Sequence, residues 1–356
     1  MYDYQILISQ RYGGISRYFY ELIKNLDKMD NVDTELPVSF NRNVYFEEYF
    51  GKKSKDKYLP KTGRLIVYYN QQRAKSELRK TDIFHPTYYH PYALRAVNKL
   101  NTKLVITVYD MIHEMFPQYF PDSDNVIKYK KKSMEIADAI IAISNSTKND
   151  ILRIHPHIDS DKITVIHLGT IFEKQLVKIE LPSKYLLFVG ERGGYKNFDA
   201  FIRAFAFVAR KDNELTLLCI GKPFEESEIA SLKQLDVYEK TSCRRISDKE
   251  FYTVYNKAHC FVFPSLYEGF GIPVLESMYC GCPALLANCS SLPEVGGDAA
   301  LYFNPSDPNQ IAECIRAVDT HREKLVKKGY ERAKLFSWEN MAKQTHEIYK
   351  KLLSKA

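Results

Sequence analysis

Short strand-type runs alternate with helical stretches along almost the whole chain of 356 residues, and this rhythm restricts the folds that are open to it. Continuous apolar runs such as YLLFVG (185–190) and CFVFPS (260–265) are typical of strands buried on both faces, as in parallel sheets. Amphipathic stretches such as SRYFYELIKNL (16–26) lie between them. The alternation predicts an α/β protein whose parallel sheets are covered by helices. The other expected strands are TELPVSF, DIFHP, KLVITVYD, DAIIAIS, KITVIHLG, LTLLCIG, PALLA and AALYF.

The length suggests two domains of similar size. A charged stretch, TIFEKQLVKIELPSK, separates two series of strands, so we place the linker near residues 169–183. This predicts an N-terminal domain over 1–172 and a C-terminal domain over 173–338. The tail at 339–356 reads as an amphipathic helix with no strand after it, and we expect it to pack back on the first domain.

Composition excludes several classes of protein. With 45% hydrophobic and 27% charged residues, the chain is neither disordered nor collagen-like. No apolar run reaches the ~18 residues of a membrane span, and the first residues do not resemble a secretory signal. The odd number of cysteines, seven, predicts reduced core thiols in a cytoplasmic protein. The spacing of Cys280 and Cys282 is not that of a zinc site, and we expect no bound metal.

The net charge of +7 is unevenly distributed. Residues 52–103 hold thirteen Lys or Arg but only three acidic residues. Such a face attracts nucleic acid, anionic lipid or anionic ligands, and it is equally typical of solvated helices. Within it, LIVYYNQQRAKSELRK (65–80) interleaves aromatic with basic residues, as in a membrane-surface helix or an ordinary amphipathic helix.

Ligands of open parallel sheets bind beyond the carboxyl ends of the strands, so the loops there carry the candidate site residues. After CFVFP, the loop Glu268, Gly269, Phe270 and Gly271 leads into a helix that has Pro273 in its first turn. Glycines before a helix N-terminus expose backbone N–H groups that suit a phosphate. Glu276 is placed to accept hydrogen bonds from a ribose diol, although Glu268 as a helix cap and Glu276 as a surface residue is the structural alternative.

The loop after YLLFV is also rich in glycine. Gly190 opens it, and Arg192 and Lys196 have the charge and geometry of a diphosphate clamp. The pattern is not a Walker A motif, since no Gly-Lys-Ser/Thr is present. A turn with solvated charges is the alternative.

Two further groups of residues lie in the first half of the chain. Gly13 and Gly14, after Tyr12, lead directly into a helix and allow close approach of a ligand or of the sheet. Polar and aromatic side chains that suit a sugar follow the strands DIFHP and KLVITVYD, although each could be structural. They are His85, Tyr88, Tyr89, Tyr109, Asp110 and His113.

With these residues in place, the chain resembles the retaining glycosyltransferases of family 4, group 1. The resemblance rests on EGFGIPVLE (268–276), on the GGISRY and GERGGYKN segments and on SSLPEVGGDAALYFNPSD (290–307). It implies the GT-B fold, in which two Rossmann-like parallel-sheet domains face each other across a cleft. The acceptor would bind the N-terminal domain and a nucleotide-sugar the C-terminal one, and the last helix would cross back to the first domain.

The resemblance also implies roles for single residues. Catalytic roles fall to Glu268, Lys196, Arg192, His113 and Asp110. Donor binding falls to Gly13, Gly14, Gly190, Arg192, Lys196, Arg245, Ile246, Glu268, Gly269, Phe270, Gly271, Ile272, Pro273, Val274 and Glu276. Acceptor binding falls to Tyr12, His85, Tyr88, Tyr89 and Tyr109. Two departures bear on these roles: the family often has His in place of Tyr109, and Glu191 separates the usual arginine from the preceding glycine.

The function implied is metal-independent, retaining transfer of a hexose from a nucleotide-sugar, GDP-mannose by preference, with no cofactor. The acceptor would be a glycan or lipid-linked glycan in cell-surface polysaccharide synthesis. UDP-glucose or UDP-N-acetylglucosamine as donor, or a GT-B sugar-nucleotide epimerase, are the alternatives. We expect a cytoplasmic protein, peripheral on the inner face of the cell membrane through its basic N-terminal face, that does not bind nucleic acid.

Overall fold

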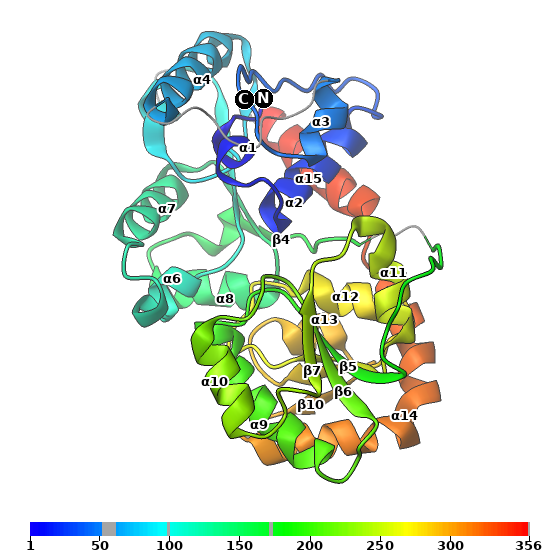
Figure 1. Ribbon diagram of the computed structural model, residues 1–356. Coiled ribbons are helices and arrows are strands. Elements are labelled where there is room, and N and C mark those ends of the chain that lie inside the picture. The colour runs from blue at the N-terminus through cyan, green and yellow to red at the C-terminus, as the bar shows by residue number, and fades with distance from the viewer. Residues whose placement is uncertain (52–61, 98–99, 171–173, 355–356) are drawn as a thin grey trace. The chain divides into compact units, whose positions relative to one another are not determined.

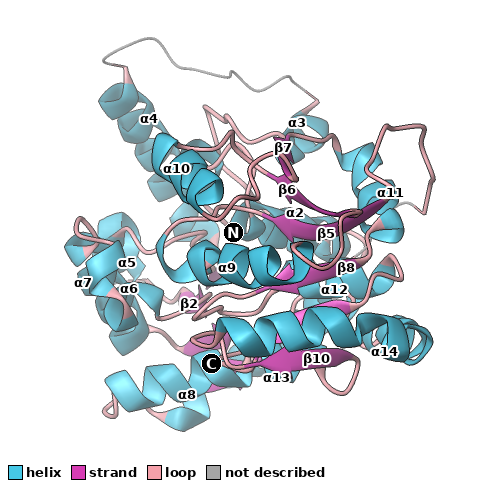
Figure 2. Cartoon of the chain, turned by 60° about the horizontal axis from the view of Figure 1, so that its bottom comes forward, coloured by secondary structure: helices cyan, strands magenta, loops and turns pink. Residues whose placement is uncertain are grey.

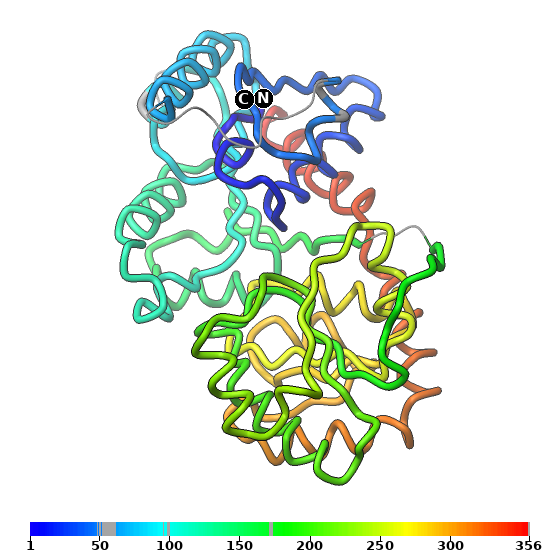
Figure 3. Tube along the Cα trace, viewed as in Figure 1, coloured from blue at the N-terminus to red at the C-terminus, as the bar shows by residue number. Residues whose placement is uncertain are grey.

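The computed structural model describes residues 1–51, 62–97, 100–170 and 174–354 (Figures 1 and 3). The chain divides into two compact units: unit 1 is Met1–Leu168 with Trp338–Ala356, and unit 2 is Gly169–Ser337. The domain boundary predicted at residues 172 and 173 lies outside the described residues.

Unit 1 contains a parallel sheet in the order β1-β2-β3-β4. Its strands are β1 (Ile83–Phe84), β2 (Lys103–Val108), β3 (Ala139–Ala142) and β4 (Ile163–Val165). The central strands β2 and β3 are almost wholly buried, as their continuous apolar runs predict, and they align Val105 with Ala139. The N-terminal residues lie along the other side of β1, because Met1 donates to the Ile83 carbonyl and accepts from the His85 N–H.

Helices surround this sheet. They are α1 (Gln5–Ser9), α2 (Gly14–Leu26), α3 (Tyr45–Phe50), α4 (Gly63–Glu77), α5 (Leu94–Val97), α6 (Ile112–Met115), α7 (Asp124–Ile136), α8 (Asn145–Ile154) and α15 (Trp338–Leu353). Short 3₁₀ helices cover Leu78–Lys80, Pro91–Ala93, Pro117–Tyr119 and Ser160–Lys162. The C-terminal helix α15 packs against α2 within unit 1 (Figure 1). Burial of the apolar faces of both helices holds the end of the chain on the unit that begins it.

One expected strand is absent and one unexpected strand is present. TELPVSF (34–40) forms no strand, because Pro37 has no N–H to pair and the buried Asn70 side chain accepts from the N–H groups of Ser39 and Phe40. In unit 2, Thr241–Arg244 forms strand β7 at a sheet edge, where its half-polar sequence carries no apolar signal.

Unit 2 contains a parallel sheet in the order β10-β9-β8-β5-β6-β7. Its strands are β5 (Lys184–Val189), β6 (Leu215–Ile220), β7 (Thr241–Arg244), β8 (Cys260–Phe263), β9 (Ala284–Ala287) and β10 (Ala300–Phe303). The order of connection reverses between β5 and β8, which pair directly with Leu186 opposite Cys260. Such a reversal creates a crevice at the carboxyl ends of the two strands, where ligands of this architecture bind.

Helices cover both faces of the second sheet. They are α9 (Phe198–Ala209), α10 (Glu226–Gln234), α11 (Asp248–Lys257), α12 (Ile272–Tyr279), α13 (Leu292–Gly296) and α14 (Pro308–Lys334), with a 3₁₀ turn at Gly194–Lys196. Figure 2 shows α9 and α14 lying side by side over the strands, and these two helices are in contact. The expected class, two α/β units with parallel sheets, is confirmed. None of the helices in the described ranges has the length and apolar character required to cross a bilayer.

Candidate functional site

The loops after β5 and β8 meet at the carboxyl edge of the unit 2 sheet. The two strands are parallel neighbours, so their following loops lie together. The Leu266 N–H donates to the Tyr195 carbonyl at 2.8 Å. Lys196 Nζ lies 2.7 Å from Glu268 Oε1, and both side chains are largely buried. The structure therefore joins two of the predicted catalytic residues in one ion pair.

Asn197 holds this junction together. Its backbone is in the left-handed region at φ 57°, a conformation that asparagine tolerates better than most residues. Its side-chain amide donates to the carbonyl groups of Pro264 at 3.0 Å and Pro305 at 2.7 Å. The loops after β5, β8 and β10 are thus tied to one side chain next to Lys196.

Lys196 stays cationic in this setting. Burial disfavours its charged form, but the adjacent Glu268 carboxylate and the Tyr195 side chain together outweigh burial and raise the pKa of Lys196. The ammonium also lies over the rings of Tyr195 and Phe263, at 4.9 and 5.4 Å from their centroids. An ammonium has three donors, so contact with Glu268 leaves capacity for an anionic ligand.

The loop 268–271 ends at the N-terminus of α12, as predicted. Gly271 has φ 101°, and a Cβ atom there would lie 3.0 Å from Leu292 Cδ2, so the position requires glycine. Ile272 starts the helix, and Pro273 lies in its first turn where a missing N–H costs nothing. The helix ends at Tyr279, before Gly281 with φ 72°.

Two serines that the sequence analysis did not single out hold this loop in place. Ser290 accepts from the Glu268 N–H at 2.9 Å, and Ser291 donates to the carbonyl groups of Glu268 and Phe270 at 2.8 and 2.9 Å. Both follow β9, the strand next to β8. The segment SSLPEV begins two residues after the expected strand PALLA, and this position could have marked the serines as site candidates.

Glu276 is buried in α12, so the interpretation of it as a surface residue is wrong. The hydroxyl of the buried Tyr255 donates to its carboxylate at 3.2 Å. Arg245 is exposed and Ile246 is half-buried in the loop after β7. This loop lies at the carboxyl ends of the strands, as does the loop that carries Lys196. Contacts of these residues with a ribose or a base stay predictions.

Arg192 has partners that the sequence analysis did not anticipate. Its guanidinium, with only 4% of the side chain exposed, contacts Glu228 of α10 through two nitrogens at 2.7 and 3.0 Å. It also donates to the Pro223 carbonyl at 2.9 Å and lies 4.8 Å from the centre of the Phe224 ring. The interpretation of Arg192 as a solvated charge is therefore wrong. The side chain anchors the turn that begins at Gly190 (φ 117°), and its contact with a diphosphate stays a prediction.

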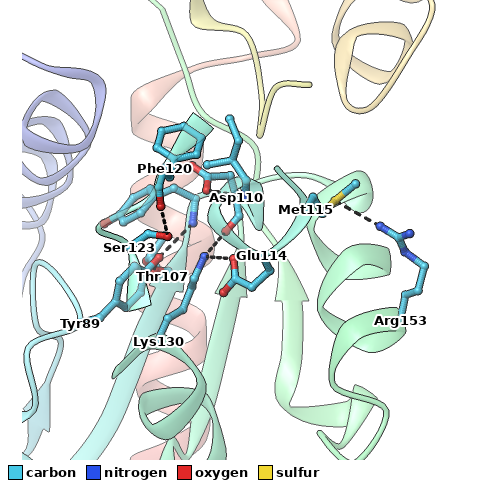
Figure 4. Close-up of polar contacts among 11 residues, drawn as sticks. Tyr89, Thr107, Asp110, Glu114, Met115, Phe120, Ser123, Lys130 and Arg153 are labelled. Atoms are coloured by element: carbon cyan, nitrogen blue, oxygen red, sulfur yellow. Dashed lines mark hydrogen bonds and ion pairs between the residues drawn. The ribbon is translucent and has the colours of Figure 1, made fainter. Parts of the chain in front are cut away.

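In unit 1, the loop after β2 folds over a buried lysine (Figure 4). Lys130 Nζ donates to Glu114 Oε2 at 2.8 Å and to the Asp110 carbonyl at 2.9 Å. His113, half-buried, lies 4.7 Å from the Phe120 ring, centre to centre. Burial lowers the pKa of His113, and the nearby Asp110 carboxylate opposes this only in part. The predicted pair Asp110 and His113 thus lies in one short loop, whereas Lys130 was hidden among neighbouring surface lysines of the same helix.

His85 is a core residue, which corrects its expected role in acceptor binding. It is 1% exposed, and its ring nitrogens lie 2.6 Å from the Tyr349 hydroxyl and 2.8 Å from the Thr107 hydroxyl. The histidine therefore links α15 to β2. Tyr89 is similarly buried and donates to the Thr107 carbonyl at 3.2 Å. Burial likewise leaves Tyr109 little surface for an acceptor.

The remaining predicted residues of unit 1 lie at its surface or at the start of α2. Tyr12 is exposed and Tyr88 half-buried, so both are accessible. At Gly13 a Cβ atom would meet the end of the flexible Gln10 side chain, whose amide oxygen accepts from the Ser16 N–H. Gly14 is the first residue of α2. A ligand contact of either glycine stays a prediction.

The described parts of the chain contain no group of three or more His, Cys, Asp or Glu residues that could hold a metal ion. The cysteines are free thiols and four of them are buried, Cys219 and Cys260 within strands and Cys280 and Cys282 between α12 and β9, in agreement with the expected core thiols.

Both halves of the chain match family models of sugar-transferring enzymes. Residues 12–173 match the model described as Glycosyltransferase Family 4, and residues 170–334 match the model described as Glycosyl transferases group 1. The chain is 28% identical to O-antigen chain mannosyltransferase B of Escherichia coli, over 95% of this chain and 96% of the relative. It is also 28% identical to the O-antigen chain mannosyltransferase RfbU of Salmonella typhimurium, over 74% and 78% of the two chains.

Solved structures share the fold at lower sequence identity. A glycosyltransferase from Rickettsia africae has a TM-score of 0.75 and 16% identity, with 98% of this chain and 97% of that chain covered. HepE of Anabaena in complex with UDP and glucose has a TM-score of 0.74 and 15% identity, with 94% and 95% covered. The fold expected from the sequence, GT-B, is confirmed.

Proposed function

This chain belongs to the group 1 and family 4 glycosyltransferases, and on that premise we propose that it transfers mannose from GDP-mannose to a growing cell-surface polysaccharide. The similarity to two O-antigen mannosyltransferases over most of the chain supports both the sugar and the glycan acceptor. A complex of HepE with UDP and glucose supports a nucleotide-sugar donor of some kind. UDP-glucose or UDP-N-acetylglucosamine is the alternative donor.

The observation that carries the proposal is the Lys196–Glu268 pair beside the N-terminus of α12. Cleavage of the sugar–diphosphate bond places negative charge on the leaving group. We assign Lys196 and the backbone N–H groups of Gly271 and Ile272 to that charge, because a buried cation and a helix N-terminus stabilise it without reorganisation. Pro273 has no N–H, and the Val274 N–H donates to the Gly271 carbonyl. Glu268, held by Lys196 and by the two serines, would accept hydrogen bonds from donor sugar hydroxyls.

We propose retention of the anomeric configuration, no cofactor and no metal requirement. In a front-face mechanism the leaving phosphate takes the acceptor proton, so no enzyme nucleophile is needed. Lys196 would supply the charge that a divalent ion supplies elsewhere. The anomeric coupling in the product NMR spectrum tests retention. Equal rates in EDTA and in Mg²⁺ would support metal independence, and a rate restored only by Mg²⁺ would contradict it.

Helix α4 supports peripheral association with an anionic membrane. Leu65, Tyr68 and Tyr69 are 57, 55 and 56% exposed on the side opposite the buried residues of the helix. Arg64 and Arg73 are exposed beside them. Apolar and aromatic side chains flanked by cations suit a lipid–water interface with anionic lipid. The predicted basic residues at 52–61 lie outside the described residues.

Sedimentation with vesicles tests this association. We expect binding to vesicles containing phosphatidylglycerol, weak binding to phosphatidylcholine alone, and loss of binding in a Leu65→Ser/Tyr68→Ser/Tyr69→Ser variant. Phe207→Ser, which changes an exposed aromatic residue of unit 2, is the matched control. Equal sedimentation of the triple variant and the wild type would contradict the assignment of α4.

The donor is tested by thermal unfolding in the presence of GDP, UDP, ADP and their sugars. A ligand at 100 times its Kd stabilises the folded state by about 2.7 kcal/mol, so the true donor gives the largest shift in Tm. We expect GDP-mannose to give it, followed by transfer of radiolabelled mannose to membrane extracts. A larger shift in Tm with a UDP-sugar would identify that sugar nucleotide, and not GDP-mannose, as the donor. Conversion of the nucleotide-sugar to an epimer without acceptor would identify an epimerase instead.

A further inference from the structure

We propose that Lys130 is a positioning residue for the transfer reaction: its hydrogen bond to the Asp110 carbonyl fixes the loop after β2 that carries Asp110 and His113. This inference rests on the proposed function and on the catalytic roles that the family resemblance implies for those two side chains. Lys130 acts through the backbone of Asp110, and Figure 4 shows the hydrogen bond between them.

The burial of Lys130 is unusual for its segment. In α7, Lys128, Lys131 and Lys132 are exposed, whereas Lys130 is only 1% exposed. Burial of an ammonium is costly unless hydrogen bonds and an opposite charge compensate it. Glu114 supplies the charge, and the Tyr89 ring lies 5.8 Å from Nζ.

The contact with Asp110 goes beyond charge compensation. The Glu114 carboxylate alone would neutralise the ammonium, yet Nζ also donates to the main chain at Asp110, two residues after the end of β2. The Asp110 carboxylate in turn accepts from the Ile112 N–H at 3.1 Å, which starts α6. Lys130 therefore holds both ends of the turn between β2 and α6 in one geometry.

Within the described residues, the same loop keeps unused hydrogen-bonding capacity. Glu114 Oε1 and His113 Nδ1 are buried and have no hydrogen-bond partner. Buried polar atoms are usually satisfied, so two exceptions in one turn indicate a place that a ligand hydroxyl or ordered water completes. A turn that keeps such groups in place without a ligand requires an anchor, and Lys130 is that anchor.

The test compares Lys130→Met with Lys130→Met/Glu114→Gln. The single variant leaves the Glu114 carboxylate buried and uncompensated and should lower both the urea midpoint and kcat. The double variant keeps the side-chain oxygen of residue 114 but removes its charge, so it should recover most of the midpoint. If Lys130 positions the loop, kcat of the double variant stays about 100-fold below wild type, the loss typical of a small misplacement. Lys131→Met, at an exposed neighbour, is the control and should match the wild type.

Two readouts separate positioning from plain stability and from failure of the proposed function. Affinity for GDP should be unchanged in every variant, since neither Lys130 nor the loop 109–115 carries a residue assigned to donor binding. Hydrogen exchange at amides 109–115 should be faster in the double variant although its midpoint is restored. Recovery of both kcat and slow exchange in the double variant would overturn the inference. A wild type that transfers no sugar would refute the proposed function, and the exchange rates would still decide whether Lys130 orders the loop.

Discussion

The ammonium of Lys196 lies 2.7 Å from a carboxylate oxygen of Glu268, although 72 residues separate the two along the chain. They meet because they follow β5 and β8, which are adjacent at the point where the strand order reverses. One side chain is a potential counter-ion for a diphosphate, and the other is an acceptor for sugar hydroxyls. Their pairing places both functions at one end of α12.

Replacing Lys196 by Met should reduce kcat by about 100- to 1,000-fold, since it removes the buried charge that we assign to the leaving group. Steady-state transfer assays and GDP titration measure the effect, and GDP affinity should also fall. Lys222→Ala is the matched control, because Lys222 forms an exposed ion pair with Glu191. Both residues follow strands at the carboxyl end of the unit 2 sheet, as Lys196 does. Such pairs contribute about 0–1 kcal/mol. Wild-type turnover in the Lys196 variant would contradict the assignment of Lys196 as a counter-ion for the diphosphate.

Replacing Ser291 by Ala should destabilise the loop 268–271, whose carbonyl groups the serine contacts. The single proton of the buried hydroxyl is shared between two carbonyl groups, and leaving a buried acceptor unsatisfied costs about 1–3 kcal/mol. We expect a lower Tm and weaker donor binding, measured by calorimetry with and without GDP. Ser306→Ala, at an exposed position, should change stability by less than about 0.5 kcal/mol. Equal Tm values for both variants would show that the serine does not hold the loop.

Replacing Gly271 by Ala should destabilise unit 2 by about 1–3 kcal/mol, the cost of a side chain in a disfavoured backbone region. The new Cβ would also press on Leu292. Gly193→Ala is the control, since Gly193 has φ −75° and open space around its Cβ position. Thermal unfolding compares the two variants. A wild-type Tm in the Gly271 variant would mean that the N-terminus of α12 accommodates a side chain without strain.

Replacing Arg192 by Met should cost about 3–5 kcal/mol, because Glu228 is left without its partner. Arg192→Met/Glu228→Gln should recover most of that stability, because it removes the uncompensated charge while the side-chain oxygen still accepts from the Glu225 N–H at the start of α10. We expect the double variant to keep GDP affinity, since the guanidinium is engaged by Glu228 and Pro223. Isothermal titration of GDP decides the point: weak binding in a stable double variant would assign Arg192 to the diphosphate after all.

The buried His85 should make unit 1 sensitive to acid. Burial lowers the pKa of His85 to about 3, whereas the unfolded chain binds a proton near pH 6.5. Above pH 6.5 neither state is protonated. Below it only the unfolded state takes up the proton, so this group lowers the free energy of unfolding by up to about 1.4 kcal/mol per pH unit down to pH 3.

Urea unfolding followed by Trp338 fluorescence measures this effect, because Trp338 is the single tryptophan and is buried in unit 1. His85→Gln should be less stable than the wild type at pH 7.5, and its stability should fall less steeply between pH 6.5 and 4.5. Parallel slopes for the two proteins would assign the acid sensitivity to other groups.

Much of the fold could be predicted because its signals are local. Apolar runs such as those of β5 and β8 are continuous, as burial on both faces requires, and Gly271 with Pro273 marks the start of α12. Strand β7 and the irregular segment at 34–40 could not be predicted, since an edge position and the Asn70 contact override local propensity.

The candidate site was predictable only in part for the same reason. Lys196 and Glu268 each carried a loop signal, but a lysine such as Lys130 looks the same in sequence whether it is solvated or buried. The opposite error concerns His85. A polar residue after a strand is a site candidate until its partners are known, and His85 is hydrogen-bonded to Tyr349, 264 residues away, within the core.

The amino-acid sequence by itself determined the parallel α/β architecture, the loops that carry the predicted donor-site residues and the family, since these depend on residue type and spacing. Only the tertiary structure decided which charges are paired: Lys196 with Glu268, Arg192 with Glu228, and Lys130 with Glu114. The physical reason is that an ion pair depends on distance and burial, and both arise when strands far apart in the chain become neighbours.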